Sequence, residues 1–399
     1  MSKEMIIIQP SVTIPDFLVR EVVAKLAYVD PLVAHVVAEE SGDLRLQLHR
    51  SPDSVEFQAL NIKVQRVIAL LVATTREPMI KVSENHMDQP VLCHLDPMIA
   101  LNKEGHVIQT GAGMFALGPR VASLCRYFET RLFQLAVAHG AYGYRFPAMI
   151  PAQFFEKIQY FKNFPHSLSL VVHLQEDLEV IERFAKEVCC SNGVMNIPEG
   201  SFSAIQNLLS PTVCHNFYLF LANQTLSHTP MIATAQGQCF RYESINMHSL
   251  ERLWNFTMWE IIFVGSSQEV KECLDRVSQD VSRLLQSFGL AYRCENANDP
   301  FFIREFGMQA GFQQIYDLKY EYRARLPFNE TTLAIGSKNY HMDFFGRSVH
   351  ITLPSRGFAH SGCIGIGLER LAFAFMAQYG IDPDQWPEIV KIGIQDQGC

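Results

Sequence analysis

An arginine and a glutamate two residues apart are the first side chains in this sequence that could do chemistry. Arg241 and Glu243 lie in the sequence Phe-Arg-Tyr-Glu at residues 240–243. If this segment is a strand, both side chains project to the same face. The arginine could then bridge a carboxylate and a phosphate with its planar fork of donors, and the glutamate could accept from a ligand amine. Because an Arg–Glu pair on a sheet face is more often a structural salt bridge, this motif alone leaves both interpretations open.

A second candidate is the sequence Gly-Ile-Gly-Leu-Glu-Arg at residues 365–370, which indicates a strand that turns into a helix. Glycines let a ligand approach the backbone, and Arg370 in the first helical turn could meet a phosphate. The dinucleotide-binding fingerprint needs a third glycine and usually a later acid, so this is a different motif. By itself, a plain tight turn explains it at least as well.

Taken together, in this order and more than a hundred residues apart, the two motifs resemble motifs 2 and 3 of class II aminoacyl-tRNA synthetases. The helix predicted at 120–139 and the aromatic, proline-broken strand at 142–147 would then be a degenerate motif 1, which forms the dimer interface in that family. The resemblance covers about residues 111–399. It implies an antiparallel β-sheet flanked by helices and a homodimer.

The segment after motif 2 looks like the corresponding part of seryl-tRNA synthetases. By that resemblance Arg241 would hold the α-phosphate of ATP and Arg252 the γ-phosphate, and Glu243 would belong to the same site. Phe256 would stack on one face of adenine, and Arg370 would stack on the other while touching the γ-phosphate. Three guanidiniums around a triphosphate and two flat groups around a purine make a coherent site. Without the neighbouring motifs, core packing would be the preferred interpretation of Phe256.

Three further residues resemble the metal site of the atypical, methanogenic-type seryl-tRNA synthetases: Cys214, Glu260 and Cys363. Two thiolates and a carboxylate would make a three-ligand zinc site with one open position, as in a catalytic zinc centre. In those relatives the open position takes the α-amino group of the substrate, so Glu260 also belongs to the substrate site. Spacing alone cannot identify ligands this far apart, and singly they would be two buried thiols and a paired acid. His215 is not a ligand in that pattern.

The same resemblance implies a substrate and magnesium site along residues 335–346, with Ser337 and Asn339 as candidates. The acidic residue that helps to hold Mg²⁺ in seryl enzymes is not obvious here. Residues 331–334 read Thr-Thr-Leu-Ala near its expected place, and Glu330, which is close by, need not share its register.

These motifs need a sheet to position them. Short strand-like runs joined by local connections, with helices set apart, favour an antiparallel α+β domain. A capping-box pattern at residues 266–269 predicts the start of one of those helices. We predict a small N-terminal α/β domain of unknown role at 1–108 and a catalytic domain at 109–399. The predicted strands include 218–221, 239–242, 260–264, 319–324 and 349–353.

Composition limits the partners. The chain has 399 residues, of which 48% are hydrophobic and 19% charged, as is ordinary for a globular protein. Its net charge of −8 disfavours a large tRNA footprint, because a protein that grips a polyanion usually carries a basic surface. We find no apolar run long enough for a signal peptide or a membrane span and expect a cytoplasmic protein. The ten cysteines include no CxxC and are read as reduced thiols, some of them candidate metal ligands.

The N-terminal region shows neither a coiled-coil arm with sustained heptads nor a basic face. The chain therefore resembles the amino acid:[carrier protein] ligases, which form an aminoacyl-adenylate and pass it to the phosphopantetheine thiol of a carrier protein. We expect an AMP-forming ligase that uses ATP, Mg²⁺ and Zn²⁺. By family analogy its substrate is a small amino acid, glycine or alanine, with serine left open. An atypical seryl-tRNA synthetase and a non-catalytic synthetase paralogue are the alternatives.

Overall fold

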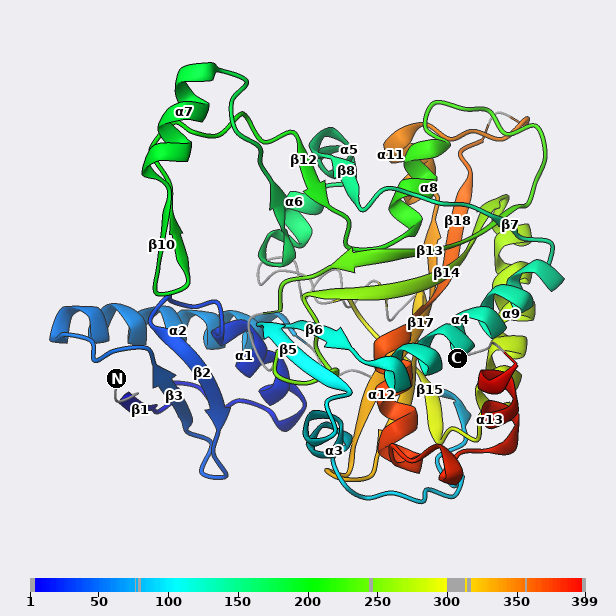
Figure 1. The fold of residues 1–399 in the computed structure, drawn as a ribbon, viewed down its shortest axis with the longest axis horizontal. Coiled ribbons are helices and arrows are strands. Elements are labelled where there is room, and N and C mark those ends of the chain that lie inside the picture. Colours follow the sequence, from blue (N-terminus) through cyan, green and yellow to red (C-terminus); the bar gives the residue numbers. More distant parts are fainter. Residues whose placement is uncertain are drawn as a thin grey trace.

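An eight-stranded sheet forms the centre of the chain in the computed structural model (Figure 1). Its order is β4-β15-β16-β17-β18-β14-β13-β7, and every neighbouring pair is antiparallel except β7 and β13. This confirms the predicted α+β class. The structure describes residues 4–75, 77, 80–243, 247–299, 313, 317–355 and 357–396. The strands are β4 (Val82–Asn85), β7 (Tyr142–Gly143), β13 (Met231–Phe240), β14 (Asn255–Gly265), β15 (Tyr292–Asn296), β16 (Lys319–Leu326), β17 (Thr331–Met342) and β18 (His360–Gly367).

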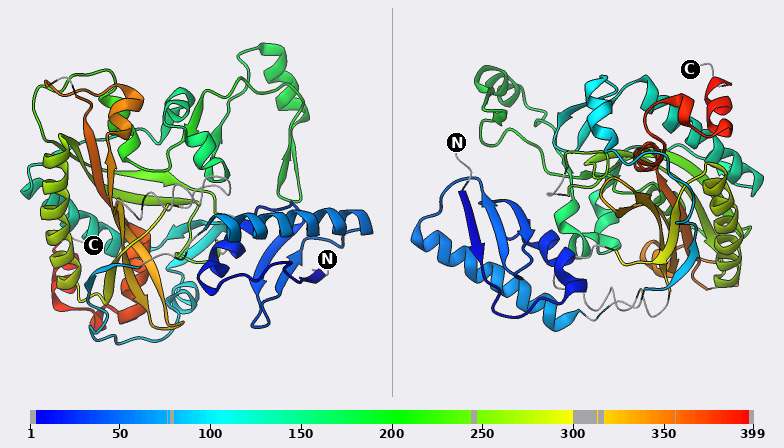
Figure 2. Two further views of the ribbon diagram at one scale, coloured as in Figure 1. Left: turned by 180° about the vertical axis from the view of Figure 1, so that it is seen from behind. Right: turned by 90° about the horizontal axis from the view of Figure 1, so that it is seen from below.

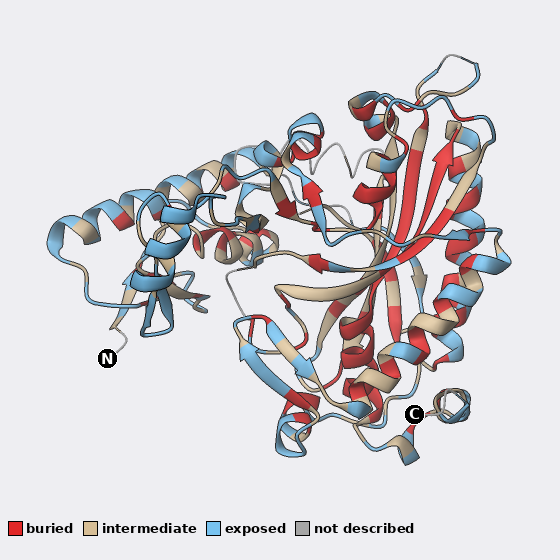
Figure 3. Cartoon of the chain, turned by 45° about the horizontal axis from the view of Figure 1, so that its top comes forward, coloured by how far each residue is buried: buried red, intermediate tan, exposed pale blue. Residues whose placement is uncertain are grey.

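Helices cover both faces of this sheet. On one face α4 (Pro119–Ala138), α9 (Ser267–Ser287) and α12 (Leu368–Tyr379) share a core with alternate residues of the central strands. In α12 every residue except Arg370 is buried, and Figure 3 shows burial concentrated there and in the central strands. A second core on the opposite face includes Ile262 and Cys363 and residues of four helices. These are α5 (Ala152–Lys157), α6 (Tyr160–Asn163), α8 (Cys214–Phe220) and α11 (Phe344–Val349).

The capping box predicted at residues 266–269 is confirmed. The Ser266 hydroxyl accepts from the Glu269 amide at 3.3 Å, and the Glu269 carboxylate accepts from the Ser266 amide at 2.8 Å. Two of the unpaired amides at the start of α9 are thereby satisfied. The position of α9 against β14, β17 and β18 follows from this defined start and from its apolar face.

Residues 4–75 form a unit with a core of its own, which we call the N-terminal unit. Strands β1 (Glu4–Ile8), β2 (Val33–Ala38) and β3 (Leu44–Leu48) pair in the order β1-β3-β2, and α1 (Val19–Leu26) and α2 (Ser54–Thr74) pack on them. Strand β4, by contrast, pairs with β15 of the central sheet. The predicted boundary at residue 108 therefore lies after a segment, β4, that already belongs to the central sheet. The division into 1–108 and 109–399 stays a prediction.

Helix α2 is long and apolar enough to cross a membrane by length and composition alone. Our expectation that no segment is long enough rested on unbroken apolar runs, and Glu56, Lys63 and Arg66 interrupt this one. In the structure its residues Leu60, Val64, Ile68 and Leu71 are fully buried in the core of the N-terminal unit. One side of the helix thus packs on this core, while other apolar residues such as Val55 and Ile62 are exposed.

Residues 149–209 form an insertion between β7 and β13. Its small sheet has the order β8-β12-β9, and an arm made of α7 and a hairpin projects away from the central sheet (Figures 1 and 2). No residue of α7 is buried. The elements are β8 (Met149–Pro151), α6 (Tyr160–Asn163), β9 (Leu170–Val171), α7 (Leu178–Glu187), β10 (Cys189–Ser191), β11 (Val194–Asn196) and β12 (Asn207–Leu209). Elsewhere lie α3 (Pro97–Lys103), β5 (Val107–Gly111), β6 (Met114–Leu117), α13 (Glu388–Gln395) and the 3₁₀ turns Asp16–Leu18, Pro165–Ser167 and Pro383–Gln385.

Two predicted strands are wrong. Residues 218–221 belong to α8 and the residue after it, and the segment 349–353 holds only the end of α11 and an isolated bridge at Thr352. In the first case the aromatic composition favoured a strand. The residues that the second core buries, however, are Cys214, Phe217, Tyr218 and Leu221, which have the i, i+3, i+4, i+7 spacing of a helix face.

Candidate active site

The register of the central strands brings four predicted site residues onto one face of the sheet. Glu260 of β14 lies opposite Gly365 of β18, which lies opposite Ser337 of β17. Two residues along, Cys363 lies opposite Asn339. Directly opposite residues share a face, so these side chains surround Gly365. A Cβ at Gly365 would lie 3.2 Å from Cγ of Glu260, and a glycine there keeps the floor of the site open.

The predicted metal ligands come together. Cys214 stands in the first turn of α8, and ligand atoms of Cys214, Glu260 and Cys363 all lie within 4.8 Å of one another. All three side chains are buried, and among the described residues no other group of this kind was found. One carboxylate oxygen of Glu260 accepts from the Thr212 hydroxyl, and the other is buried without a partner. A buried unpaired oxygen is costly, and a cation would satisfy it. Two sulfurs and one oxygen fit Zn²⁺.

The charges of this triad depend on one another. Burial raises the pKa of Glu260 to about 7, and the neighbouring Cys363 thiolate contributes to the rise. A hydrogen bond from Cys214 holds the pKa of Cys363 well below its usual value, whereas burial raises that of Cys214. Without a cation, the cluster therefore favours a single thiolate on Cys363. A dication would let all three ligands ionise together.

Residues that the sequence did not reveal hold these ligands in place. The Thr212 hydroxyl contacts the Glu260 carboxylate and lies 3.5 Å from Sγ of Cys214. Nδ2 of Asn339 donates to Cys363 Sγ at 3.7 Å and to Ser337 Oγ at 2.9 Å. Nε2 of His341 lies 4.0 Å from the same sulfur. Such outer contacts orient metal ligands. His341 lies within the segment 335–346 but was not singled out, and the strand register places it here. Thr212 lies between β12 and α8, and its contacts with Glu260 and Cys214 place it here.

The predicted nucleotide residues also lie together. Nε of Arg241, which follows β13, donates to the Pro211 carbonyl at 2.8 Å, and its guanidinium lies 5.5 Å from the centre of the Phe256 ring. The Glu243 carboxylate accepts from Arg252 at 2.6 Å and pairs with Arg370 at 3.8 Å. Two guanidiniums thus pair with one carboxylate, and the charge of Arg241 also acts on it. Three cations near one anion leave positive charge that suits a polyphosphate.

The charge of Glu243 is stabilised by these arginines. Burial would raise the pKa of its carboxyl, but Arg370, Arg252 and Arg241 together hold it below its ordinary value. Burial lowers the pKa of Arg370, and Glu243 opposes that change. Glu243 is therefore ionised at neutral pH and links arginines from two separate motifs.

A further glutamate ties motif 3 to motif 2. Both carboxylate oxygens of Glu369 lie 2.9 Å from the Thr257 amide, which donates to them. Thr257 follows Phe256, and Glu369 precedes Arg370. This contact fixes the first turn of α12 against β14 and so sets the separation of the two groups predicted to enclose adenine.

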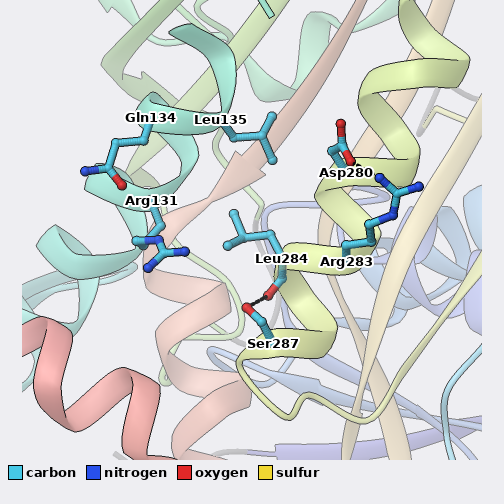
Figure 4. A pocket seen from close by; sticks show the side chains of 7 residues that line it. All are labelled: Arg131, Gln134, Leu135, Asp280, Arg283, Leu284 and Ser287. Carbon is cyan, nitrogen blue, oxygen red and sulfur yellow. Dashed lines mark hydrogen bonds and ion pairs between the residues drawn. The ribbon is translucent and has the colours of Figure 1, made fainter. Parts of the chain in front are cut away.

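One hollow in the described part of the chain lies away from these residues. It is formed between α4 and α9 (Figure 4), and none of the predicted site residues lines it. Its lining residues are Arg131, Gln134, Leu135, Asp280, Arg283, Leu284 and Ser287.

The raised pKa of Glu260 predicts a pH-dependent stability of the metal-free protein. Because the folded-state pKa of about 7 exceeds the ordinary 4.5, the stabilising contribution is complete below about pH 4.5 and is lost as the pH rises through 7. We expect metal-free wild-type protein to lose melting temperature relative to metal-free Glu260→Gln between about pH 5 and pH 8. Thermal melts in a chelator test this. Parallel curves for the two proteins would contradict it, and added Zn²⁺ should stabilise only the wild type.

Comparisons with known proteins place the chain in a family. Residues 204–379 match the family described as tRNA synthetase class II core domain (G, H, P, S and T). Amino acid–[acyl-carrier-protein] ligase 1 of Bradyrhizobium diazoefficiens is 30% identical over 271 residues, which cover 66% of this chain and 81% of that protein. Ligase 2 of the same organism is 31% identical, and the match covers 62% of this chain and 72% of that protein. Type-2 serine–tRNA ligase of Methanothermobacter thermautotrophicus is 26% identical, and the match covers 70% of this chain but only 56% of the relative.

Solved structures show the same fold. SerRS of M. kandleri, solved in complex with A. aeolicus tRNASec, superimposes with a TM-score of 0.71 at 20% identity and covers 98% of this chain and 77% of that one. Seryl-tRNA synthetase of Pyrococcus horikoshii, complexed with ATP, superimposes with a TM-score of 0.55 at 14% identity. The match covers 86% of this chain and 80% of that one.

Proposed function

Because this chain belongs to the family of class II tRNA synthetase core domains, we propose that it is an AMP-forming ligase that activates a small amino acid with ATP and transfers it to the phosphopantetheine thiol of a carrier protein. One observation carries the proposal: Phe256 and Glu260 lie on the same face of β14, four residues apart. That spacing is about 13 Å along a strand. It separates the guanidinium cluster from the Cys–Glu–Cys triad by roughly the reach of an aminoacyl-adenylate.

In the first step a carboxylate oxygen of the amino acid attacks the α-phosphorus of ATP. The bond from that phosphorus to the bridging oxygen breaks, and pyrophosphate leaves. Arg241 would orient the carboxylate against the α-phosphate, and Arg252 and Arg370 would hold the departing pyrophosphate. The carboxylate is already ionised at neutral pH, so no general base is needed. Positioning and charge neutralisation supply the acceleration.

In the second step the carrier thiol attacks the carbonyl of the mixed anhydride and expels AMP. The thioester bond forms as the acyl–phosphate bond breaks, and the thiol proton is released to solvent.

Cys214, Glu260 and Cys363 would hold zinc, which would supply a Lewis acid for the α-amino group and so favour substrates that have one. Ser337 and Asn339, on the same face, would contact the substrate. Magnesium would arrive with the triphosphate, since Mg²⁺ is commonly bound by substrate phosphates and one or two carboxylates. Glu330 lies exposed before β17, which argues against it as that carboxylate.

The carrier protein is favoured over tRNA as the acceptor by the relatives and by charge. The match spans 81% of the first Bradyrhizobium ligase but 56% of the methanogen serine–tRNA ligase, and the net charge is −8. Glycine or alanine is the proposed substrate, with serine open. We also propose a cytoplasmic homodimer by family analogy.

The test is amino-acid-dependent ATP–pyrophosphate exchange across the twenty amino acids with zinc present. Exchange with one small amino acid, followed by its transfer to a phosphopantetheinylated carrier protein, is the expected result. Charging of bulk tRNA instead would favour the seryl-tRNA synthetase alternative. Absence of exchange with all twenty would contradict the proposal and revive a non-catalytic paralogue.

A further inference from the structure

The N-terminal unit touches the backbone of motif 2. Tyr28, two residues beyond the end of α1, donates from its hydroxyl to the Tyr242 carbonyl at 3.3 Å. Tyr242 stands between Arg241 and Glu243, the two motif 2 residues that we place in the nucleotide site. Tyr28 and Tyr242, which are 214 positions apart in sequence, thus meet at the carbonyl that leads to Glu243.

The same stretch of backbone is held from other sides. The Tyr242 amide donates to the Ser167 carbonyl at 3.2 Å, and the Trp254 indole donates to the Ser169 hydroxyl at 2.7 Å. The Trp254 amide donates to the Gly113 carbonyl at 2.9 Å. Gly113 has a φ of +65°, and a Cβ there would lie 2.6 Å from the Trp254 nitrogen, so the close approach requires glycine. The Tyr242 and Trp254 rings meet edge to face at 5.0 Å.

The contact with the N-terminal unit is part of a packed junction. The Tyr28 ring meets the His166 ring edge to face at 5.3 Å, and Phe164 packs on the core of the N-terminal unit. Burial, together with the charge of Lys25, lowers the pKa of His166 to about 4. His166 is therefore neutral at pH 7, and the junction does not depend on its charge. The N-terminal unit and residues 164–169 form one block against motif 2.

We propose that the N-terminal unit is a positioning element of the nucleotide site and that Tyr28 is its contact residue. This rests on the proposed function. The Arg241 amide still donates to the Trp254 carbonyl at 2.9 Å, so the ladder of β13 and β14 continues to that residue. The next two peptide groups, which lead to Glu243, lie beyond β13 and are held by the bonds with Ser167 and Tyr28. A preorganised backbone avoids an ordering cost when the nucleotide binds. Glu243 in turn holds Arg252 and Arg370, so removal of the Tyr28 hydroxyl should weaken binding of ATP. Binding of the amino acid should be spared, because Arg241 is held separately by the Pro211 and Trp254 carbonyls and the other predicted ligands stand on β14, β17 and β18.

The test compares Tyr28→Phe with wild type in the full chain with zinc. We expect the Kd of a non-hydrolysable ATP analogue and the KM for ATP in exchange to rise about threefold to tenfold, the effect of one lost hydrogen bond. The KM for the amino acid should stay at the wild-type value, and any fall in melting temperature should be no larger than that of the control variant described below. Ser169→Ala, which removes the partner of the Trp254 indole, should shift ATP affinity in the same direction.

Tyr127→Phe is the matched control. The Tyr127 hydroxyl donates to the Ile389 carbonyl at 3.0 Å between α4 and α13, so the same kind of bond is lost away from the site. It should lower the melting temperature and leave ATP affinity unchanged. Wild-type ATP affinity in Tyr28→Phe would overturn the inference, as would an equal loss of ATP affinity, amino acid affinity and melting temperature. A wild-type chain that binds no ATP analogue would instead overturn the proposed function.

Discussion

Replacing Cys363 with serine is expected to remove bound zinc and to lower ATP–pyrophosphate exchange by roughly a thousandfold, the scale seen when a group that stabilises the reacting centre is lost. The serine hydroxyl does not ionise at neutral pH and is a poor zinc ligand. Cys214 and Glu260 alone would leave two positions open, and the α-amino group would lose its contact. Metal content by elemental analysis and exchange rate at saturating ATP are the measurements.

Cys273→Ser is the matched control for this change. Cys273 lies in α9 and, like Cys363, is 3% exposed, so both substitutions place a hydroxyl in a buried thiol position. The control should keep its zinc and its exchange activity, whatever stability it loses. A Cys363→Ser protein that still holds one zinc per chain and exchanges pyrophosphate at the wild-type rate would contradict the proposed role of Cys363 as a zinc ligand.

Local patterns in the sequence were sufficient to predict those features that depend on residues close together in the chain. The Ser266–Glu269 capping box predicted the start of α9, and the order of the two arginine motifs predicted the fold class. Spacing could not bring Cys214, Glu260 and Cys363 together, because their approach depends on strand register and on the position of α8. The resemblance to a known family supplied that grouping.

Other parts of the site depend on contacts that no local pattern encodes. Thr212 lies between Glu260 and Cys214 only because the segment that joins β12 to α8 contacts Glu260 of β14. The Tyr28 hydroxyl reaches Tyr242 only because the N-terminal unit packs against residues 164–169. Helix α8 is a different case, since its helical spacing of buried residues was present in the sequence and the aromatic composition obscured it.

Replacing Arg241 with lysine is expected to lower kcat/KM for ATP by about a hundredfold to a thousandfold even though the charge is kept. Arg241 donates from Nε to the Pro211 carbonyl while its plane lies near the Phe256 ring. An ammonium has no planar fork, so it cannot keep the carbonyl contact and also bridge a carboxylate and a phosphate. Steady-state exchange kinetics with varied ATP and varied amino acid measure the loss, which should appear for both substrates.

Arg347→Lys separates this effect from the general cost of exchanging an arginine that lies on an aromatic ring. The Arg347 guanidinium lies 5.1 Å from the centre of the Phe358 ring and pairs with Asp343 at 2.6 Å, on α11 rather than on motif 2. This variant should exchange pyrophosphate at close to the wild-type rate. If Arg241→Lys did the same, a charge anywhere near the α-phosphate would suffice, and the bridging role of Arg241 would have to be abandoned. A loss confined to the KM for ATP would instead assign Arg241 to ground-state binding of the nucleotide, because a group that acts in the transition state also lowers kcat.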